Sequence, residues 1–249
     1  MSKFNGSVIL GLYEQAMEPA RARLKTRVFG LLESNKDPQF WHKFLVAYCA
    51  QGVHMTKDVP RWIAQSGDKA IQLGSKTFGE ILRSHAAHEE GHHELFINDA
   101  NSLIDLYRQK YNEEINPAAV PWNPLLPSVR QYRQCHEDII QSSMPLRQVA
   151  LEYEVEMLSV AIGGDLFQRI VGICGHDIIP CLTFITEHVA ADVGHTKFNR
   201  ILLDRILLKH GEKLDQFYKT GQHILEIYAD YLISLADYTA HHMTLRLAI

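Results

Sequence analysis

Apolar residues recur three and four positions apart along most of this 249-residue chain, whereas no stretch alternates apolar and polar residues as a half-buried strand would. In residues 7–33, for example, Ile9, Tyr13 and Ala16 fall on one helical face. The sequence contains no internal repeat and no low-complexity tract. This pattern predicts an all-α bundle of seven or eight helices with a buried interior.

Prolines and polar caps indicate where the helices begin. Asp37 can cap a helix that starts at Pro38, and Pro127 and Pro145 suit first helical positions, where a missing N–H removes no hydrogen bond. We expect helices over about residues 7–33, 38–48 and beyond, 60–66, 77–100, 103–111, 127–141, 145–163, 165–172, 178–208 and from 213 onward. The proline-rich loop at 116–127 is too short to link two domains, so we expect a single domain over residues 1–249.

Composition excludes several classes of protein. Hydrophobic residues make up 46% and charged residues 22%, which is ordinary for a soluble globular chain and excludes extensive disorder. The formal net charge of -4 argues against a nucleic-acid-binding surface. The N-terminus lacks a basic-then-apolar signal pattern, and no uninterrupted apolar run reaches membrane-spanning length. We therefore expect a cytoplasmic protein that binds neither nucleic acid nor membrane.

The four cysteines show no C-x-x-C spacing and stand in apolar or helical contexts. We predict that Cys49, Cys135, Cys174 and Cys181 are buried free thiols in a reducing compartment.

A triplet of potential metal ligands lies in the apolar run from 178 to 208. On a helix, His188, Asp192 and His195 project from successive turns of one face. Two imidazoles and a carboxylate suit a borderline metal such as iron or zinc. A helical surface can also carry these residues by chance, so the triplet alone does not decide the matter.

A second group lies about a hundred residues upstream. His85, Glu89 and His92 stand at i, i+4 and i+7, and Glu89-x-x-His92 is the spacing by which diiron bundle proteins present a carboxylate and an imidazole to a shared site. The alternative is a solvated helix face. His85 and His88 remain open, either as hydrogen-bonding supports of the ligands or without a role.

The helix after Pro145 carries three glutamates, of which Glu154 has apolar neighbours at helical spacing, including Leu151 and Leu158. A carboxylate in a buried stripe is costly unless its charge is compensated, and a metal compensates it. We therefore choose Glu154 as the third carboxylate ligand. The alternative is a buried ion pair with Arg147 or another cation.

Together these residues resemble the ligand set of the haem-oxygenase-like diiron oxidases and oxygenases. That family uses a Glu and a His on one core helix, a Glu on a second and His-x3-Asp-x2-His on a third. The matching residues here are Glu89, His92, Glu154, His188, Asp192 and His195. Because the spacing on the first helix varies in the family, Glu90 and His93 are alternatives to Glu89 and His92. The resemblance covers about residues 40–208 and implies the haem-oxygenase-like fold.

The resemblance implies a non-haem enzyme with two irons, Fe(II) or Fe(III), that uses O2 as co-substrate. Its expected reaction is oxidation of a small amine- or amino-acid-derived metabolite in natural-product biosynthesis, by N-oxygenation, C–C cleavage or desaturation. A substrate carboxylate would need a cation, for which the candidates are Arg83, Arg147, Lys197 and Arg200. Tyr48, Trp41 and Phe44 are candidates for the pocket wall, although we expect core packing for at least two of them. We also expect a homodimer.

Two other classes remain open. The first is a metal-free enzyme of the same fold, either a TenA-like hydrolase with a cysteine nucleophile or a PqqC-like oxidase. The second is a non-catalytic metal-binding protein. Turnover that depends on O2 separates the non-catalytic protein from the diiron enzyme.

Overall fold

A computed structural model of the chain shows an all-α fold. The structure describes residues 6–243, and for residues 188–193 it describes the backbone alone. No strand occurs in that part of the chain. The α-helices are α1 (Val8–Ser34), α2 (Pro38–Thr56), α3 (Val59–Gln72), α4 (Lys76–Ala86), α5 (His92–Tyr111), α6 (Pro127–Gln141), α7 (Gln148–Leu158), α8 (Gly164–Cys174), α9 (Thr183–Lys209) and α10 (Leu214–Tyr238). Short 3-10 turns and two π-helical segments, Ser159–Gly163 and Thr239–Met243, connect or extend them.

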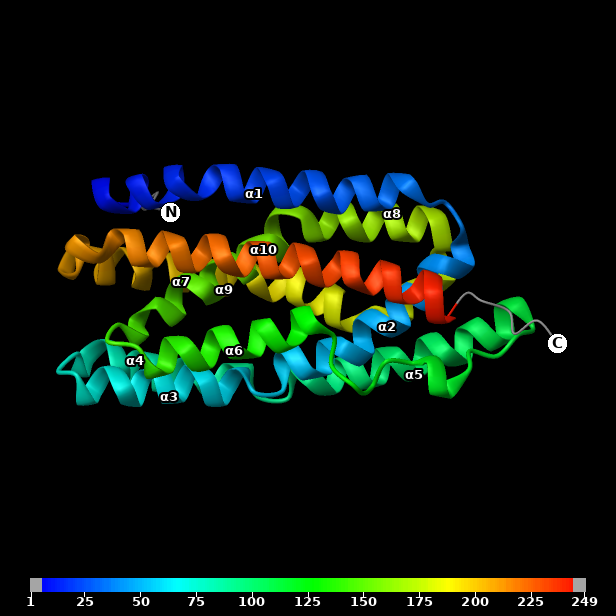
Figure 1. The fold of residues 1–249 in the computed structure, drawn as a ribbon, viewed down its shortest axis with the longest axis horizontal. Helices are drawn as coiled ribbons and strands as arrows, with labels where there is room; N and C mark the ends of the chain where they lie inside the picture. The colour runs from blue at the N-terminus through cyan, green and yellow to red at the C-terminus, as the bar shows by residue number, and fades with distance from the viewer. Residues whose placement is uncertain (1–5, 244–249) are drawn as a thin grey trace.

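The helices form an elongated bundle (Figure 1). Helix α1 lies along α10 on one side. On the opposite side, α3 and α4 form a hairpin toward one end of the bundle, and α2 packs on α5 toward the other end. Helices α7 and α9 pack on each other between these layers. The centre of the bundle is therefore built from segments that are far apart in the sequence.

Helix starts follow the predicted caps. The Asp37 side chain accepts a hydrogen bond from the Gln39 N–H at 2.9 Å, and Pro38 opens α2. Pro127 is likewise the first residue of α6, and Pro145 opens the 3-10 turn that leads into α7. In each case proline stands where its missing N–H leaves no helical hydrogen bond unmade.

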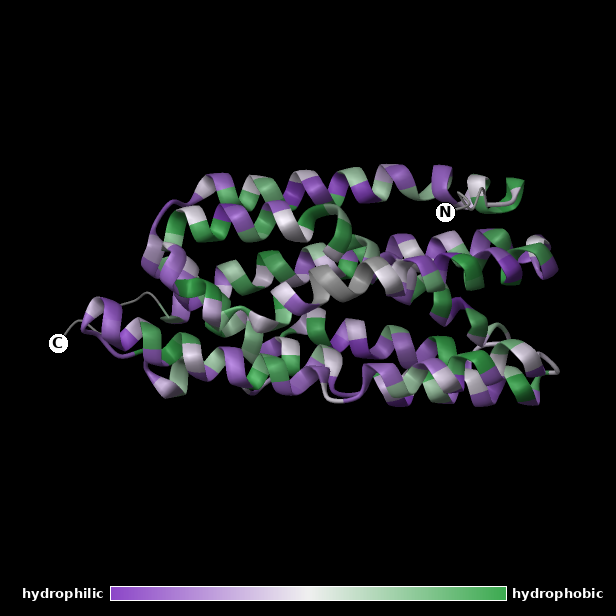
Figure 2. Cartoon of the chain, turned by 180° about the vertical axis from the view of Figure 1, so that it is seen from behind, coloured by the Kyte–Doolittle hydropathy of each residue, from purple (hydrophilic) through white to green (hydrophobic). Residues whose placement is uncertain are grey.

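Apolar stripes at helical spacing bury one side of each outer helix. In α1 the buried stripe contains Leu10, Tyr13, Met17, Ala20, Leu24, Val28 and Leu32. Hydrophobic and hydrophilic residues share the helix surfaces in bands, as Figure 2 shows. The predicted all-α class is confirmed. Residues at helical spacing share one face of each helix, and these faces meet in one continuous core.

Helix α3 is longer than the sequence pattern predicts. It was expected to end near Ser66 and Gly67, but it continues to Gln72. Gly67 lies inside the helix because α4 comes very close at this point: a Cβ added to Gly67 would lie 2.6 Å from the Gly79 carbonyl oxygen. The glycine permits helix contact here and does not end the helix.

The histidine-rich segment is not the single helix that we expected over residues 77–100. Helix α4 ends at Ala86, a 3-10 turn covers Ala87–Glu89, and α5 begins at His92. Gly91 separates them with a φ of 85°, a left-handed conformation that glycine adopts without strain. The physical reason for the break is that α4 packs on α3 while α5 packs on α2.

The two helices expected over residues 145–163 and 165–172 form one continuous helical stretch, Pro145–Cys174. Contrary to the sequence-based expectation, this stretch is long and apolar enough to cross a membrane by length and composition. It carries three buried carboxylates, those of Glu152, Glu154 and Glu156. Carboxylates are costly in lipid, so the stretch fits the core helix of a bundle in water. Location of the protein in the cytoplasm stays a prediction.

Candidate metal centre

The break in the histidine-rich segment brings two predicted ligands together. Glu89 ends the 3-10 turn and His92 begins α5, and the His92 Nδ1 lies 3.0 Å from the Glu89 Oε2. Both side chains face the interior, with Glu89 only 14% exposed. Glu89 and His92 therefore lie side by side, although a 3-10 turn and the start of α5 position them instead of one continuous helix.

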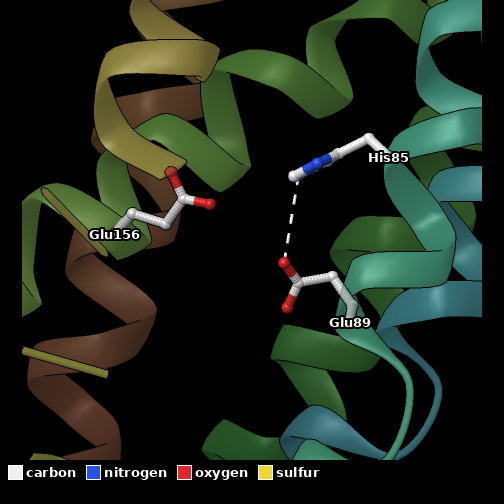
Figure 3. Close-up of side chains that lie close together, drawn as sticks. All are labelled: His85, Glu89 and Glu156. Carbon is white, nitrogen blue, oxygen red and sulfur yellow. Dashed lines mark ion pairs between the residues drawn. The ribbon is translucent and has the colours of Figure 1, made fainter. Parts of the chain in front are cut away.

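His85 and Glu156 complete a compact group around Glu89. Their ligand atoms and a Glu89 oxygen all lie within 4.8 Å of one another. Figure 3 shows His85 and Glu89 reaching from one side toward Glu156 on the other. The His85 Nε2 and the Glu89 Oε1 are 3.9 Å apart, too far for a hydrogen bond, and both atoms are buried without a hydrogen-bond partner. Enclosed orphan atoms of this kind are unusual and indicate a missing partner.

Helix α9 supplies further groups on the Glu156 side. The His195 Nδ1 lies 3.6 Å from the Glu89 Oε1 and 4.0 Å from the Glu156 Oε1. The Asn199 amide nitrogen donates hydrogen bonds to both Glu156 oxygens at 2.9 Å. One residue of α9, His195, thus lies close to both carboxylates, and another, Asn199, fixes the orientation of Glu156.

The titratable groups fit a site for a cation. Burial raises the pKa of Glu89, but the hydrogen bond and charge of His92 outweigh this and hold that pKa below its usual value. Burial lowers the pKa of His85, which keeps the imidazole neutral with a lone pair free to bind a metal. A carboxylate beside a neutral imidazole is the protonation state that metal ligation requires.

A cavity of about 150 Å³ opens beside this group. Its polar lining includes Glu89, His92, Glu152, Glu156 and His195. Most of its wall is apolar, with residues such as Val155, Leu158, Ile162, Phe184 and Ile185. The π-helical segment Ser159–Gly163 forms part of the wall, which is a common place for this irregularity. Tyr48 also lines the cavity, whereas Trp41 and Phe44 are packed in the core, as expected for at least two of these aromatic residues.

The predicted ligand Glu154 lies elsewhere, and this choice is corrected. Its carboxylate accepts hydrogen bonds from the Arg21 Nε at 2.8 Å, from the Arg21 Nη2 at 2.7 Å and from the Tyr13 hydroxyl at 2.9 Å. Glu154 is fully buried and does not line the cavity. The ion-pair alternative therefore describes its surroundings, with Arg21 of α1 as the cation.

The other predicted ligands have different outcomes. His188 and Asp192 belong to α9, but their side chains lie outside the described residues. Glu90 is exposed, and Glu89 is the member of that pair in the cluster with His85.

Sequence reasoning missed Glu156 as a site residue and left His85 open. The helical neighbours of Glu156 include the polar residues Glu152 and Ser159, a pattern that favours a side chain facing solvent. Helix α7 is buried on several faces, however, so a polar stripe there faces a site and not the solvent. The spacing of Gln148, Glu152 and Glu156, one turn apart on an otherwise apolar helix, is the signal that could have identified it.

Comparison with known proteins supports the fold alone. No protein-family model matches the chain, and no curated protein matches it. Among solved structures, the chain is similar to a domain of unknown function with a haem oxygenase-like fold from Shewanella denitrificans OS217. The two are 16% identical, with a TM-score of 0.69 over 97% of this chain and 95% of that one. This chain therefore has the haem oxygenase-like fold.

Proposed function

We propose that the chain is an O2-dependent non-haem iron oxidoreductase that holds two irons and oxidises a small amine-derived metabolite. The observation that supports this proposal most strongly is the cluster of His85, Glu89 and Glu156, whose ligand atoms lie within 4.8 Å of one another in the bundle interior. The haem oxygenase-like fold is compatible with this proposal.

The residues present fit a bound metal. The His85 Nε2 and the Glu89 Oε1 are buried, have no hydrogen-bond partner and face each other across 3.9 Å. No lysine or arginine lines the cavity among the described residues. Buried polar atoms without a partner are costly, and a metal ion between these two atoms would offset the cost.

The donor set favours iron over metals that prefer only oxygen or only sulfur. Imidazole and carboxylate ligands together suit Fe(II) and Zn(II). The residues that would hold the metals are Glu89, His92, Glu156, His195 and His85, together with the sequence-predicted His188 and Asp192. When bound, iron would supply the one-electron chemistry with O2 that amino-acid side chains lack.

The protein itself would position the substrate and exclude water. Phe184, Ile185 and Leu158 give the cavity an apolar wall beside the carboxylates. Asn199 holds Glu156 through two hydrogen bonds, so that this ligand keeps its orientation through a reaction. These are the contributions that a protein makes to a metal oxidant, namely orientation and dryness.

The cysteines weigh against the metal-free hydrolase. All four are buried and free, as predicted, and none lines this cavity. Burial raises the pKa of Cys135 to about 11 and that of Cys174 to about 12. A nucleophilic cysteine needs a depressed pKa and access to substrate, so these thiols are poorly suited to that role.

Anaerobic titration with Fe(II) tests the proposal. We expect about two irons per chain, the number held by diiron bundle proteins, followed by O2 uptake when the loaded protein meets air. Oxygen consumption is recorded with an electrode, and the Zn(II)-loaded protein serves as the redox-inactive control. One tightly bound zinc, with no O2 uptake by the iron-loaded chain, would overturn the proposal.

A further inference from the structure

Glu152 is a carboxylate in the cavity that the metal cluster does not include. It stands one helical turn before Glu156 on α7, so both side chains project toward the same space. Glu152 lines the cavity, yet it is 6% exposed. With a metal held by Glu89 and Glu156, Glu152 would be the remaining acidic group among the described residues of the wall.

The Glu152 carboxylate is held at one oxygen and open at the other. Its Oε1 accepts a hydrogen bond from the Gln148 amide nitrogen. Its Oε2 has no hydrogen-bond partner in the described part of the chain, and it is not among the fully enclosed orphan atoms. This second oxygen therefore faces the cavity and is available to a ligand there.

A buried chain of contacts through Gln148, His136 and Trp62 fixes the orientation of the Glu152 carboxylate. The same Gln148 nitrogen lies 2.8 Å from the His136 Nδ1, and the His136 ring stacks on Trp62 with centroids 4.2 Å apart. Gln148, His136 and Trp62 are each fully buried. Groups packed this tightly hold Glu152 in one position, as a residue that orients a ligand must be held.

The described wall of the cavity offers no lysine or arginine to an anionic ligand. None of the four cations considered for a substrate carboxylate, Arg83, Arg147, Lys197 and Arg200, lines it. Arg83 approaches Asp68 and Arg200 approaches Glu14, while Arg147 donates to Thr220 in a different groove. The carboxylate of an amino-acid-like substrate therefore has no lysine or arginine to pair with among the described residues of the cavity. A cationic group on a substrate, in contrast, could pair with the carboxylate of Glu152.

The remaining wall sets the size and character of the ligand. A cavity of about 150 Å³ accommodates a molecule on the scale of benzene. It adjoins a narrower, wholly apolar space beside Trp41, Phe44 and Leu45, because Tyr48 and Leu232 line both. The walls thus fit a compact hydrocarbon body and leave Glu152 as the partner for one polar end.

We propose that Glu152 is the substrate-binding residue of this cavity and that the substrate is a protonated primary amine on a small apolar body. The inference rests on the proposed iron enzyme for its reaction, though not for the binding itself. Because Glu152 lies one helical turn, about 5.4 Å along the axis, from Glu156, an amine bound to Glu152 would lie beside the proposed metal site.

Calorimetric titration of the metal-free full chain with n-hexylamine, n-hexanol and hexanoate tests this assignment, because a bound Fe(II) would itself attract the hexanoate carboxylate. At pH 9 the amine is protonated and the Glu152 carboxyl, whose pKa burial raises to about 8, is ionised, so we expect the amine to bind at least about tenfold more tightly than the alcohol, because a charge-assisted hydrogen bond is stronger than a neutral one. Hexanoate is expected to bind most weakly. This ranking needs no variant, and tighter binding of hexanoate than of hexylamine would overturn the assignment.

The variant E152Q keeps the shape and the bond to Gln148 but loses the charge. We expect about tenfold weaker hexylamine binding with hexanol binding and iron stoichiometry unchanged. The matched control is E154Q, the same change two residues away and outside the cavity, which should leave hexylamine binding as in the wild type. Unchanged hexylamine affinity in E152Q would refute the role of Glu152.

The outcomes separate this inference from the proposed function. Iron binding and O2 uptake without hexylamine binding would refute the amine assignment alone. Hexylamine binding that depends on Glu152, in a chain that takes up no iron, would refute the iron enzyme and support the ligand class.

Discussion

Two buried glutamates of α7, Glu154 and Glu156, lie two residues apart and have opposite surroundings. Glu154 meets Arg21 and Tyr13, which donate three hydrogen bonds to its carboxylate. Glu156 meets a neutral amide, that of Asn199, and faces the cluster with orphan atoms around Glu89. The first carboxylate is paired with a guanidinium, and the second stands in the group with His85 and Glu89 whose ligand atoms lie close enough together to hold a metal.

This difference separates a structural charge from a site. Removing a carboxylate from water costs several kcal/mol, and the fold must offset the cost. A guanidinium built into α1 does so permanently, whereas an exchangeable metal ion would do so only when bound. Burial of a glutamate therefore says little about function until its partner is known.

The largest expected effect comes from removing the resident cation. Arg21→Leu leaves Glu154 buried and unpaired, and we expect the free energy of unfolding to fall by about 3–5 kcal/mol. Urea denaturation measures the loss. Arg23→Leu is the control, because Arg23 is 59% exposed and pairs loosely with Glu226 at 3.7 Å, so its loss should stay below about 1 kcal/mol. Equal losses in the two variants would remove the distinction between the two glutamates.

The third buried glutamate of α7 should make the metal-free protein sensitive to pH. Burial, and then the charge of Glu89, raise the pKa of Glu152 from 4.5 to about 8. Since the folded-state pKa lies above the unfolded one, the stability contributed by the protonated acid is complete below pH 4.5 and is lost as the pH rises through about 8. We expect a loss of roughly 3 kcal/mol between pH 5 and pH 8 by urea denaturation.

The variant E152Q removes this dependence, because an amide does not ionise in that range. Its unfolding free energy should change less between pH 5 and pH 8 than that of the wild type. Parallel pH profiles for the two proteins would show that the Glu152 carboxyl is not responsible.

Metal affinity sharpens the comparison directly. Glu156→Gln should weaken Fe(II) or Zn(II) binding by about a hundredfold or more, because a neutral amide oxygen replaces an anionic ligand. Glu154→Gln, the same change on the same helix, should leave the affinity unchanged. Anaerobic calorimetric titration compares the two variants. If Glu154→Gln weakens the metal more, the original sequence-based choice of ligand was right.

The smallest effect concerns the support of Glu156. Asn199→Ala removes both hydrogen bonds to that carboxylate and should weaken metal binding about tenfold. In the double variant with Glu156→Gln the further loss should be small, since Asn199 acts through the carboxylate that is already gone. Additive losses would mean that Asn199 influences the metal by another route.

Local patterns were sufficient for most of the fold. The caps at Asp37 and Pro38, the proline starts of α6 and of the turn before α7, and the all-α class follow from periodicity and hydrogen-bonding capacity, which are properties of neighbouring residues. The errors occurred at glycines. Gly67 continues a helix and Gly91 separates two, because packing against other helices decided what each glycine does.

The candidate site divides in the same way. Glu89, His92 and His195 were predicted from spacing and face a common cavity. Helical neighbours did not show which of Glu154 and Glu156 faces the cavity, since both are buried on α7. His188 and Asp192, the two iron ions and the homodimer stay predictions.

The sequence by itself determined the helices and the chemical types of the candidate ligands, because periodicity and side-chain chemistry are local. Only the tertiary structure decided which carboxylate meets Arg21 and which meets His85 and Glu89. The reason is electrostatic: the cost of a buried charge depends on its partner, and these partners come from helices more than fifty residues away in the chain.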